Sequence, residues 1–164
     1  MAETQRPKQS KAEPSVEGAR FLIVEAPYYE EIAANLLEGA LTALKAADAR
    51  YICWQVPGAL EIPIAAKIAL DMARTAGSPF HGVIALGCVI RGETAHFDIV
   101  AGESARALMD LALAEKLPLG NGILTVENME QAQVRAEPQR GDKGGEAARA
   151  ALALYRLQAG QGTL

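Results

Sequence analysis

The stretch GVIALGCVIRGETAHFDIV, residues 82–100, changes character in its middle. Residues 82–90 are almost all apolar, which is typical of a strand covered on both faces of a parallel sheet. A helical spacing of apolar residues begins at Phe97. A buried strand that leads through a polar junction into a helix predicts a β-α unit. The junction holds Arg91, Glu93, Thr94, His96 and Asp98.

The same unit recurs on both sides of this stretch. Further strands are expected at residues 20–27, ending at Pro27, at residues 50–56 and within residues 118–128. Helices are expected from Glu30, around Pro63, from Phe97, and at 129–135 and 143–158. Four successive β-α pairs predict an α/β fold with three layers, α/β/α, around a four-stranded parallel sheet in flavodoxin-like order.

Each of the first three helices has an apolar face at helical spacing. These faces comprise Ile32, Ala33, Leu36, Leu37, Ala40, Leu41 and Leu44; then Ile62, Ala65, Ala66, Ala69 and Met72; then Phe97, Val100, Ser104, Leu108 and Leu111.

The length of 164 residues predicts one domain. Residues 1–16 are polar and contain proline, so we expect a disordered arm there, a single domain at 17–158 and a flexible tail at 159–164. No run of about 18 apolar residues suggests a membrane span, and the start of the chain lacks the apolar stretch of a signal peptide.

Net charge and cysteine content argue against several classes of partner and site. The net charge of −4 argues against nucleic acid or an anionic membrane as a partner. Cys53 and Cys88 both lie in apolar runs, and no Cys/His cluster has zinc spacing. We therefore expect two reduced core thiols, no metal site and a cytoplasmic protein.

Ligands of open parallel sheets bind beyond the carboxyl ends of the strands. That rule selects the loops at residues 26–29, 57–61, 91–96 and 121–128. In the first, Tyr28 and Tyr29 either stack on a planar ring or pack on a helix. In the second, Glu61 either binds a polyol or complements a helix dipole.

The third loop, RGETAH, carries the most information. Its amides at the start of a helix are unpaired donors that suit a phosphate, and Gly92 permits close approach. His96 is either a proton shuttle or a structural residue. Asp98 is either its partner or a solvated acid of the first turn.

Several common motifs are absent from the sequence. It contains no nucleoside-triphosphate loop, no dinucleotide fingerprint and no G-x-S-x-G elbow. The acids of a phospho-receiver are also missing at the ends of the first and third strands.

Four blocks, in order and spacing, resemble the signature of the lumazine synthase family. They are VPGALEIPIAAK (56–67), ALGCVIRGETAHFD (85–98), GILTVEN (122–128) and DKGGEAA (142–148). The resemblance spans about residues 20–157. It implies condensation of 5-amino-6-ribitylamino-2,4-pyrimidinedione with 3,4-dihydroxy-2-butanone 4-phosphate, through imine formation, phosphate elimination and ring closure, without a cofactor.

The resemblance also implies roles for individual residues. Tyr28 would stack on the pyrimidine, Ala59, Leu60 and Glu61 would hold the ring and the ribityl chain, and Cys88, Val89 and Ile90 would line the ring site. Glu93, Thr94 and Arg135 would bind the phosphate, His96 would transfer protons, and Lys143 would lie near a pyrimidine carbonyl. Asn121 replaces a phenylalanine that a neighbouring subunit commonly contributes, and Gln139 replaces a second phosphate-side lysine, with Arg140 beside it.

Members of this family form homopentamers or multiples of them, so we expect a homo-oligomer. Two other hypotheses stay open at this point. One is a shell-forming or ligand-binding paralogue with little turnover, and the other is a flavodoxin-like cofactor carrier, which only the topology supports.

Overall fold

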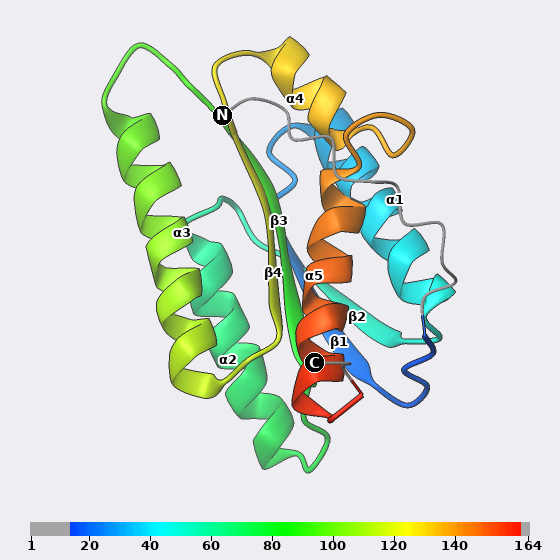
Figure 1. The fold of residues 1–164 in the computed structure, drawn as a ribbon. Helices are drawn as coiled ribbons and strands as arrows, with labels where there is room; N and C mark the ends of the chain where they lie inside the picture. Colours follow the sequence, from blue (N-terminus) through cyan, green and yellow to red (C-terminus); the bar gives the residue numbers. More distant parts are fainter. Residues whose placement is uncertain (1–13, 162–164) are drawn as a thin grey trace.

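The structure, a computed structural model, describes residues 14–161. Strands and helices alternate along the chain until two helices close it (Figure 1). The elements are β1 (Arg20–Glu25), α1 (Glu30–Ala46), β2 (Arg50–Gln55), α2 (Glu61–Thr75), β3 (Gly82–Ile90), α3 (His96–Glu115), β4 (Leu119–Val126), α4 (Met129–Ala136) and α5 (Lys143–Gln158).

The four strands form one parallel sheet in the order β2-β1-β3-β4. This confirms the predicted fold class and the flavodoxin-like order. Because β1 and β3 are the inner strands, each is paired with another strand along both edges. Ile23, for example, lies between Cys53 on β2 and Ile84 on β3.

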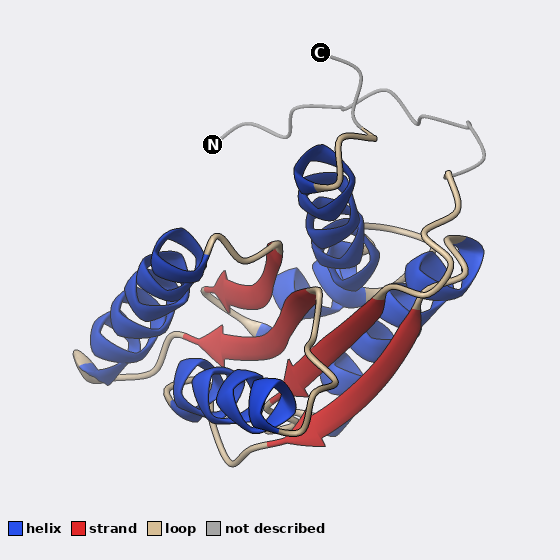
Figure 2. Cartoon of the chain, turned by 90° about the horizontal axis from the view of Figure 1, so that it is seen from below, coloured by secondary structure: helices blue, strands red, loops and turns tan. Residues whose placement is uncertain are grey.

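Helices cover both faces of the sheet (Figure 2). The alternation of side chains along a strand divides β1 between two cores. Phe21 and Ile23 pack with α1, α4 and α5, whereas Leu22 and Val24 pack with α2 and α3. Figure 1 accordingly shows α2 and α3 on one side of the sheet and the other three helices on the opposite side.

Two helix starts are closed by side chains. Asn128 accepts a hydrogen bond from the Gln131 N–H at 2.9 Å and caps α4. The Gln131 side chain in turn accepts from the Glu127 N–H at 2.9 Å. At α5, the Asp142 carboxylate accepts from the Gly145 N–H at 3.2 Å. Such caps satisfy amides that the helix itself leaves unpaired.

Helix α5 packs closely against its neighbours because glycines lie at the contacts. A β-carbon on Gly144 would overlap the backbone carbonyl of Leu36 on α1. A β-carbon on Gly120 of β4 would likewise overlap the carbonyl of Ala147 on α5. The block DKGGEAA is therefore a packing motif as well as a helix start.

Two predictions about burial are wrong. Cys53 was expected in the core but is exposed, because β2 is an edge strand and all its residues except Trp54 are exposed. Met72 was expected on the buried face of α2 but is 58% exposed. Ile64 and Ile68 of the same helix are also exposed, so α2 carries a second, uncovered apolar face.

The predicted boundaries agree closely with the observed ones. Helix α5 has the expected bounds, α4 extends one residue further than expected, and β1 ends two residues before Pro27. Most of the predicted arm at 1–16 lies outside the described residues. Val16 is described: it is buried in the core, and its N–H donates to the Ala47 carbonyl at 2.8 Å.

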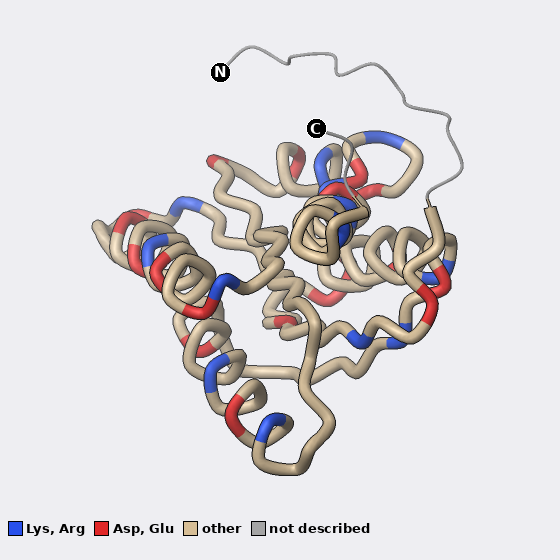
Figure 3. The backbone as a smooth tube through the Cα atoms, turned by 60° about the horizontal axis from the view of Figure 1, so that its bottom comes forward, with Lys and Arg blue, Asp and Glu red and all other residues tan. Residues whose placement is uncertain are grey.

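Acidic and basic residues are interspersed along the helices (Figure 3). On α3, for instance, Arg106 pairs with Glu103 at 2.8 Å and with Asp110 at 2.6 Å. Among residues 14–161, none of the helices combines the length and the apolar run needed to cross a membrane.

Candidate functional site

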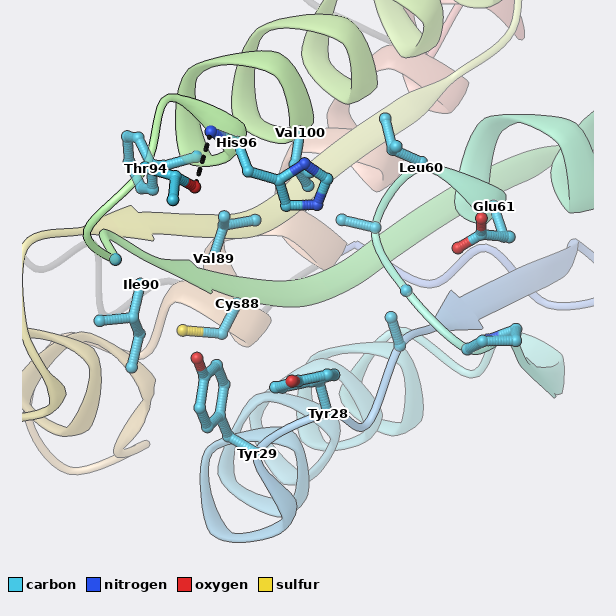
Figure 4. Close-up of a pocket in the computed structure, with 16 residues that line it drawn as sticks. Tyr28, Tyr29, Leu60, Glu61, Cys88, Val89, Ile90, Thr94, His96 and Val100 are labelled. Atoms are coloured by element: carbon cyan, nitrogen blue, oxygen red, sulfur yellow. Dashed lines mark hydrogen bonds between the residues drawn. The ribbon is translucent and has the colours of Figure 1, made fainter.

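A cavity of about 550 Å³ lies at the carboxyl edge of the sheet (Figure 4). Parallel α/β sheets bind ligands at this edge, and the volume suits a small organic molecule. The ends of β1 and β3 and the starts of α2 and α3 surround it. Its lining residues are Ala26, Tyr28, Tyr29, Pro57, Gly58, Ala59, Leu60, Glu61, Cys88, Val89, Ile90, Gly92, Thr94, His96, Phe97 and Val100.

One wall of the cavity is aromatic. The rings of Tyr28 and Tyr29 meet edge to face, with centroids 5.0 Å apart and planes at 71°. The Tyr28 side chain is 72% exposed, so the core does not require it. A large exposed ring beside an apolar strand end offers a stacking surface for a flat heterocycle.

The end of β3 supplies an apolar surface facing this wall. Burial raises the pKa of the Cys88 thiol to about 11. Burial, with smaller contributions from Cys88 and Tyr28, also raises the pKa of Tyr29. Both groups are therefore neutral near pH 7, and this part of the cavity can accept an uncharged ring without desolvating an ion.

The loop between β3 and α3 forms the polar side of the cavity. Thr94 Oγ1 accepts a hydrogen bond from the His96 backbone N–H at 3.3 Å (Figure 4). Helix α3 has no side-chain cap at Ala95, so amides at its start are available as donors. The His96 imidazole makes no hydrogen bond within residues 14–161 and is free to contact a ligand.

The loop before α2 contributes the remaining side of the cavity. The Glu61 N–H donates to the Gly58 carbonyl at 3.2 Å, which turns the chain into the helix. The Glu61 carboxylate is exposed at this helix start. It can therefore accept hydrogen bonds from hydroxyl groups of a ligand.

Comparison with known proteins identifies the family of this chain. The family model described as 6,7-dimethyl-8-ribityllumazine synthase matches residues 18–159. The chain belongs to this family. The match covers every helix and strand that the structure describes.

The sequence of this chain aligns with individual relatives along nearly their whole length. The chain is 65% identical over 147 residues to a 6,7-dimethyl-8-ribityllumazine synthase of Methylocella silvestris, covering 90% of each chain. It is 61% identical over 158 residues to the protein of that name from Azorhizobium caulinodans, covering 96% of this chain and 97% of the relative. A 6,7-dimethyl-8-ribityllumazine synthase 1 of Rhodopseudomonas palustris is 60% identical over 148 residues, with 90% and 91% covered.

Most of the residues that the resemblance to this lumazine synthase family nominated line the one cavity. They are Tyr28, Ala59, Leu60, Glu61, Cys88, Val89, Ile90, Thr94 and His96. They come from the end of β3, from the loops that follow β1, β2 and β3, and from the first residues of α2 and α3, which the parallel topology brings to one edge.

Four nominated residues do not line the cavity of this lumazine synthase family member. Glu93 lies in the same loop, between two residues that do. Asn121 is exposed on edge strand β4, where its side chain accepts from the Ile123 N–H at 3.0 Å. Arg135 bonds the Gln131 carbonyl on α4, and Lys143 pairs with Glu146 at 2.7 Å on α5. Arg135 and Lys143 thus belong to helices on the opposite face of the sheet from His96.

Other lining residues have no role assigned by the resemblance. Tyr29 and Gly92 are candidates from their loops alone, as a stacking ring and as a point of close approach. Pro57 and Gly58 lie inside another loop that the strand-end rule selects. Phe97 and Val100 are one and four residues beyond His96 on α3. Their helical spacing predicts core packing, although the same face of the helix borders the cavity. In the described part of this family member, no group of three metal-ligating side chains occurs.

Proposed function

We propose that the chain catalyses the reaction after which its family is named. It would condense 5-amino-6-ribitylamino-2,4-pyrimidinedione with 3,4-dihydroxy-2-butanone 4-phosphate to give 6,7-dimethyl-8-ribityllumazine, phosphate and water. The reaction belongs to riboflavin biosynthesis, uses no metal or redox cofactor, and would take place in the cytoplasm.

The main support is that one cavity joins an apolar ring surface to a polar helix start. The pyrimidine ring would lie against Cys88, Val89 and Ile90 with Tyr28 stacked on it. Its ribityl chain would extend along Ala59 and Leu60 towards the Glu61 carboxylate. That orientation brings the ring amines towards the loop at residues 91–96.

The phosphate of the second substrate would bind at this loop. Its oxygens would accept hydrogen bonds from the backbone amides of Glu93 and Thr94 and from the Thr94 hydroxyl. Because Thr94 Oγ1 already accepts from His96, its own proton remains available for a phosphate oxygen. The partial positive charge at the start of α3 adds to the attraction.

The bond-making steps need positioning more than a protein nucleophile. The ring amine attacks the ketone and a first water leaves to give the imine. Phosphate is then eliminated, and the ribitylamino nitrogen attacks the remaining carbonyl and closes the new ring with loss of a second water. Holding both substrates together can lower the barrier by up to about 7–11 kcal/mol. His96, between the two parts of the cavity, would move protons during these steps and contribute about 10²–10⁴-fold.

We further propose that a neighbouring copy completes the site. Asn121, Arg135 and Lys143 lie away from the cavity of their own chain, so they would act at the cavity of the next subunit. Large apolar side chains remain exposed, as expected of a subunit interface. They include Tyr51 and Ile52 on β2, Ile64, Ile68 and Met72 on α2, and Ile99, Met109 and Leu113 on α3. A pentamer or a multiple of it would bury them.

The direct test mixes both substrates with the purified full-length chain and follows lumazine fluorescence together with phosphate release. Equal yields of the two products support the proposal. Tight binding of the pyrimidine without turnover would instead identify a ligand-binding paralogue. Light scattering of the same sample measures the assembly, and a monomer with full activity would contradict a shared site.

A further inference from the structure

Arg91, at the end of β3, joins three segments next to the cavity. Its Nε donates to Glu127 Oε2 at 2.9 Å, and its Nη1 lies 3.4 Å from Asp98 Oδ1. The guanidinium carbon also lies 4.2 Å from the centroid of the Phe97 ring. One side chain therefore contacts the first turn of α3 on one side and the end of β4 on the other.

The loop that Arg91 spans has few other polar attachments. Within residues 14–161, the Arg91–Glu127 pair is the only side-chain hydrogen bond or ion pair between residues 91–98 and another element. The Thr94–His96 bond stays inside the loop. A β-carbon on Gly92 would meet nothing within 4 Å.

The segment around Glu127, which Arg91 contacts, is held in place by backbone and side-chain hydrogen bonds. The Arg91 N–H donates to the Val126 carbonyl at 2.9 Å, which continues the β3–β4 pairing. The Glu127 N–H is held by the Gln131 side chain at 2.9 Å, within the cap of α4. Glu127 therefore transmits the position of the sheet and of α4 to the guanidinium.

The charges around Arg91 favour a positioning role over contact with substrate. Two carboxylates, Asp98 and Glu127, already face its guanidinium. Arg91 does not line the cavity, whereas Phe97, on which it stacks, does. One guanidinium with two carboxylates forms a cluster of net negative charge, which does not attract a phosphate.

We propose that Arg91 is a positioning residue that sets the first turn of α3. By clamping Phe97 and Asp98 to Glu127, it holds the intervening loop so that the His96 imidazole and the Thr94 hydroxyl face the cavity. The kinetic part of this proposal rests on the proposed function, whereas the structural part concerns the order of the loop and is independent of turnover.

The kinetic test compares Arg91→Met with Arg91→Lys and with Arg106→Met. Arg106 is a matched control because it pairs with two carboxylates on the same helix, away from the cavity. We expect Arg91→Met to lower kcat about 10- to 100-fold with little change in either KM, since a small misplacement of reacting groups has effects of this size. Lysine should restore part of the rate, because it cannot span both carboxylates. Arg106→Met should resemble the wild type.

Glu127→Gln distinguishes positioning from substrate contact. If Arg91 acts through Glu127, this variant also lowers kcat, and the double variant is no worse than Arg91→Met alone. If Arg91 binds the phosphate instead, Arg91→Met raises KM for the butanone phosphate while Glu127→Gln leaves kcat unchanged. That pattern, or wild-type kinetics in Arg91→Met, would overturn the proposal.

Hydrogen–deuterium exchange at the Asp98 and Ile99 amides, which both donate to the Ala95 carbonyl in the first turn of α3, tests the same idea without turnover. Exchange should accelerate in Arg91→Met and in Glu127→Gln, but not in Arg106→Met, while protection of the sheet stays unchanged. Unchanged exchange at these two amides would contradict the positioning role even if the wild type is active. A wild type without activity would contradict the proposed function alone and leave this measurement decisive for Arg91.

Discussion

The hydroxyl oxygen of Thr94 accepts a hydrogen bond from the backbone N–H of His96 at 3.3 Å. This bond couples two groups to which we assign separate chemical tasks. The threonine oxygen accepts in this bond, so its own proton remains available to another acceptor, and the bond closes the turn that carries the imidazole.

Thr94→Val should therefore weaken use of the phosphorylated substrate. Valine keeps the shape but offers neither the acceptor nor the donor, so we expect KM for the butanone phosphate to rise about tenfold, the effect of losing a hydrogen bond to a charged group. Thr94→Ser retains both functions and is the control. Equal kinetics of the valine and serine variants would remove Thr94 from the phosphate site.

His96→Ala should lower kcat by about one to three orders of magnitude and leave pyrimidine binding nearly intact. Steady-state kinetics and pyrimidine titration measure the two effects separately. His81→Asn is the control, because His81 lies at the other end of β3 and its Nδ1 accepts from the Arg20 N–H at 3.0 Å, which an asparagine oxygen can replace. An unchanged rate in His96→Ala would exclude proton transfer by this residue.

Arg135→Ala should chiefly impair handling of the phosphorylated substrate, because the variant loses a phosphate partner. Co-expression with His96→Ala provides a stringent test of a shared site. If Arg135 serves the neighbouring cavity, mixed oligomers contain some sites with both residues intact and regain activity that neither variant has. Absence of any recovery in verified mixed oligomers would place both residues at the same subunit's site.

Gly144→Ala should destabilise the fold. The added β-carbon would overlap the Leu36 carbonyl, and such overpacking costs about 1–3 kcal/mol. Gly102→Ala on α3 is the matched control, because its β-carbon would meet nothing within 4 Å and alanine favours a helix. Thermal unfolding should show a lower Tm for the first variant and an equal or higher Tm for the second. An unchanged Tm for Gly144→Ala would contradict the close packing of α5.

The Cys88 thiol should react slowly with iodoacetamide near neutral pH. Burial raises its pKa to about 11, so its thiolate fraction, and hence its rate, should increase about tenfold per pH unit up to that value. An unfolded thiol, with a pKa of about 8.5, would level off sooner. Because the folded thiol keeps its proton to higher pH than the unfolded one, its contribution to stability falls as pH rises between these values.

The measurement uses Cys53→Ser, so that Cys88 is the only thiol of the chain. A rate that levels off near pH 9 would show that the thiol is not shielded as the structure describes.

The fold could be predicted because its local signals agree. The apolar run at residues 82–90 is an inner strand, and the DKGG sequence starts a helix where predicted. The edge position of β2 could not be predicted from its sequence. Its residues look like those of a covered strand, yet strand order leaves Cys53 on an edge. An apolar pattern indicates burial without indicating whether the same chain or another copy provides it.

The site also contains residues that the sequence places and residues that it does not. Loops after β1, β2 and β3 converge because parallel strands end at one edge, so Tyr28, Glu61 and His96 could be grouped from the sequence. The position of Arg135 across the sheet depends on packing of α4, which no motif encodes. The sequence alone assigns no role to Arg91, because its partner Glu127 is 36 residues away in the chain.

Gly92 is not required by either of the two structural constraints that usually select a glycine, a positive φ or a close contact at the β-carbon position. Its backbone does not adopt a positive φ, and the protein leaves open space where a side chain would be. Neither backbone strain nor packing within the described residues therefore requires a glycine here. Under the proposed function, the identity of the residue would be governed by the ligand that approaches the loop from the cavity. The chain thus contains a site at which selection for catalysis can be examined apart from selection for stability.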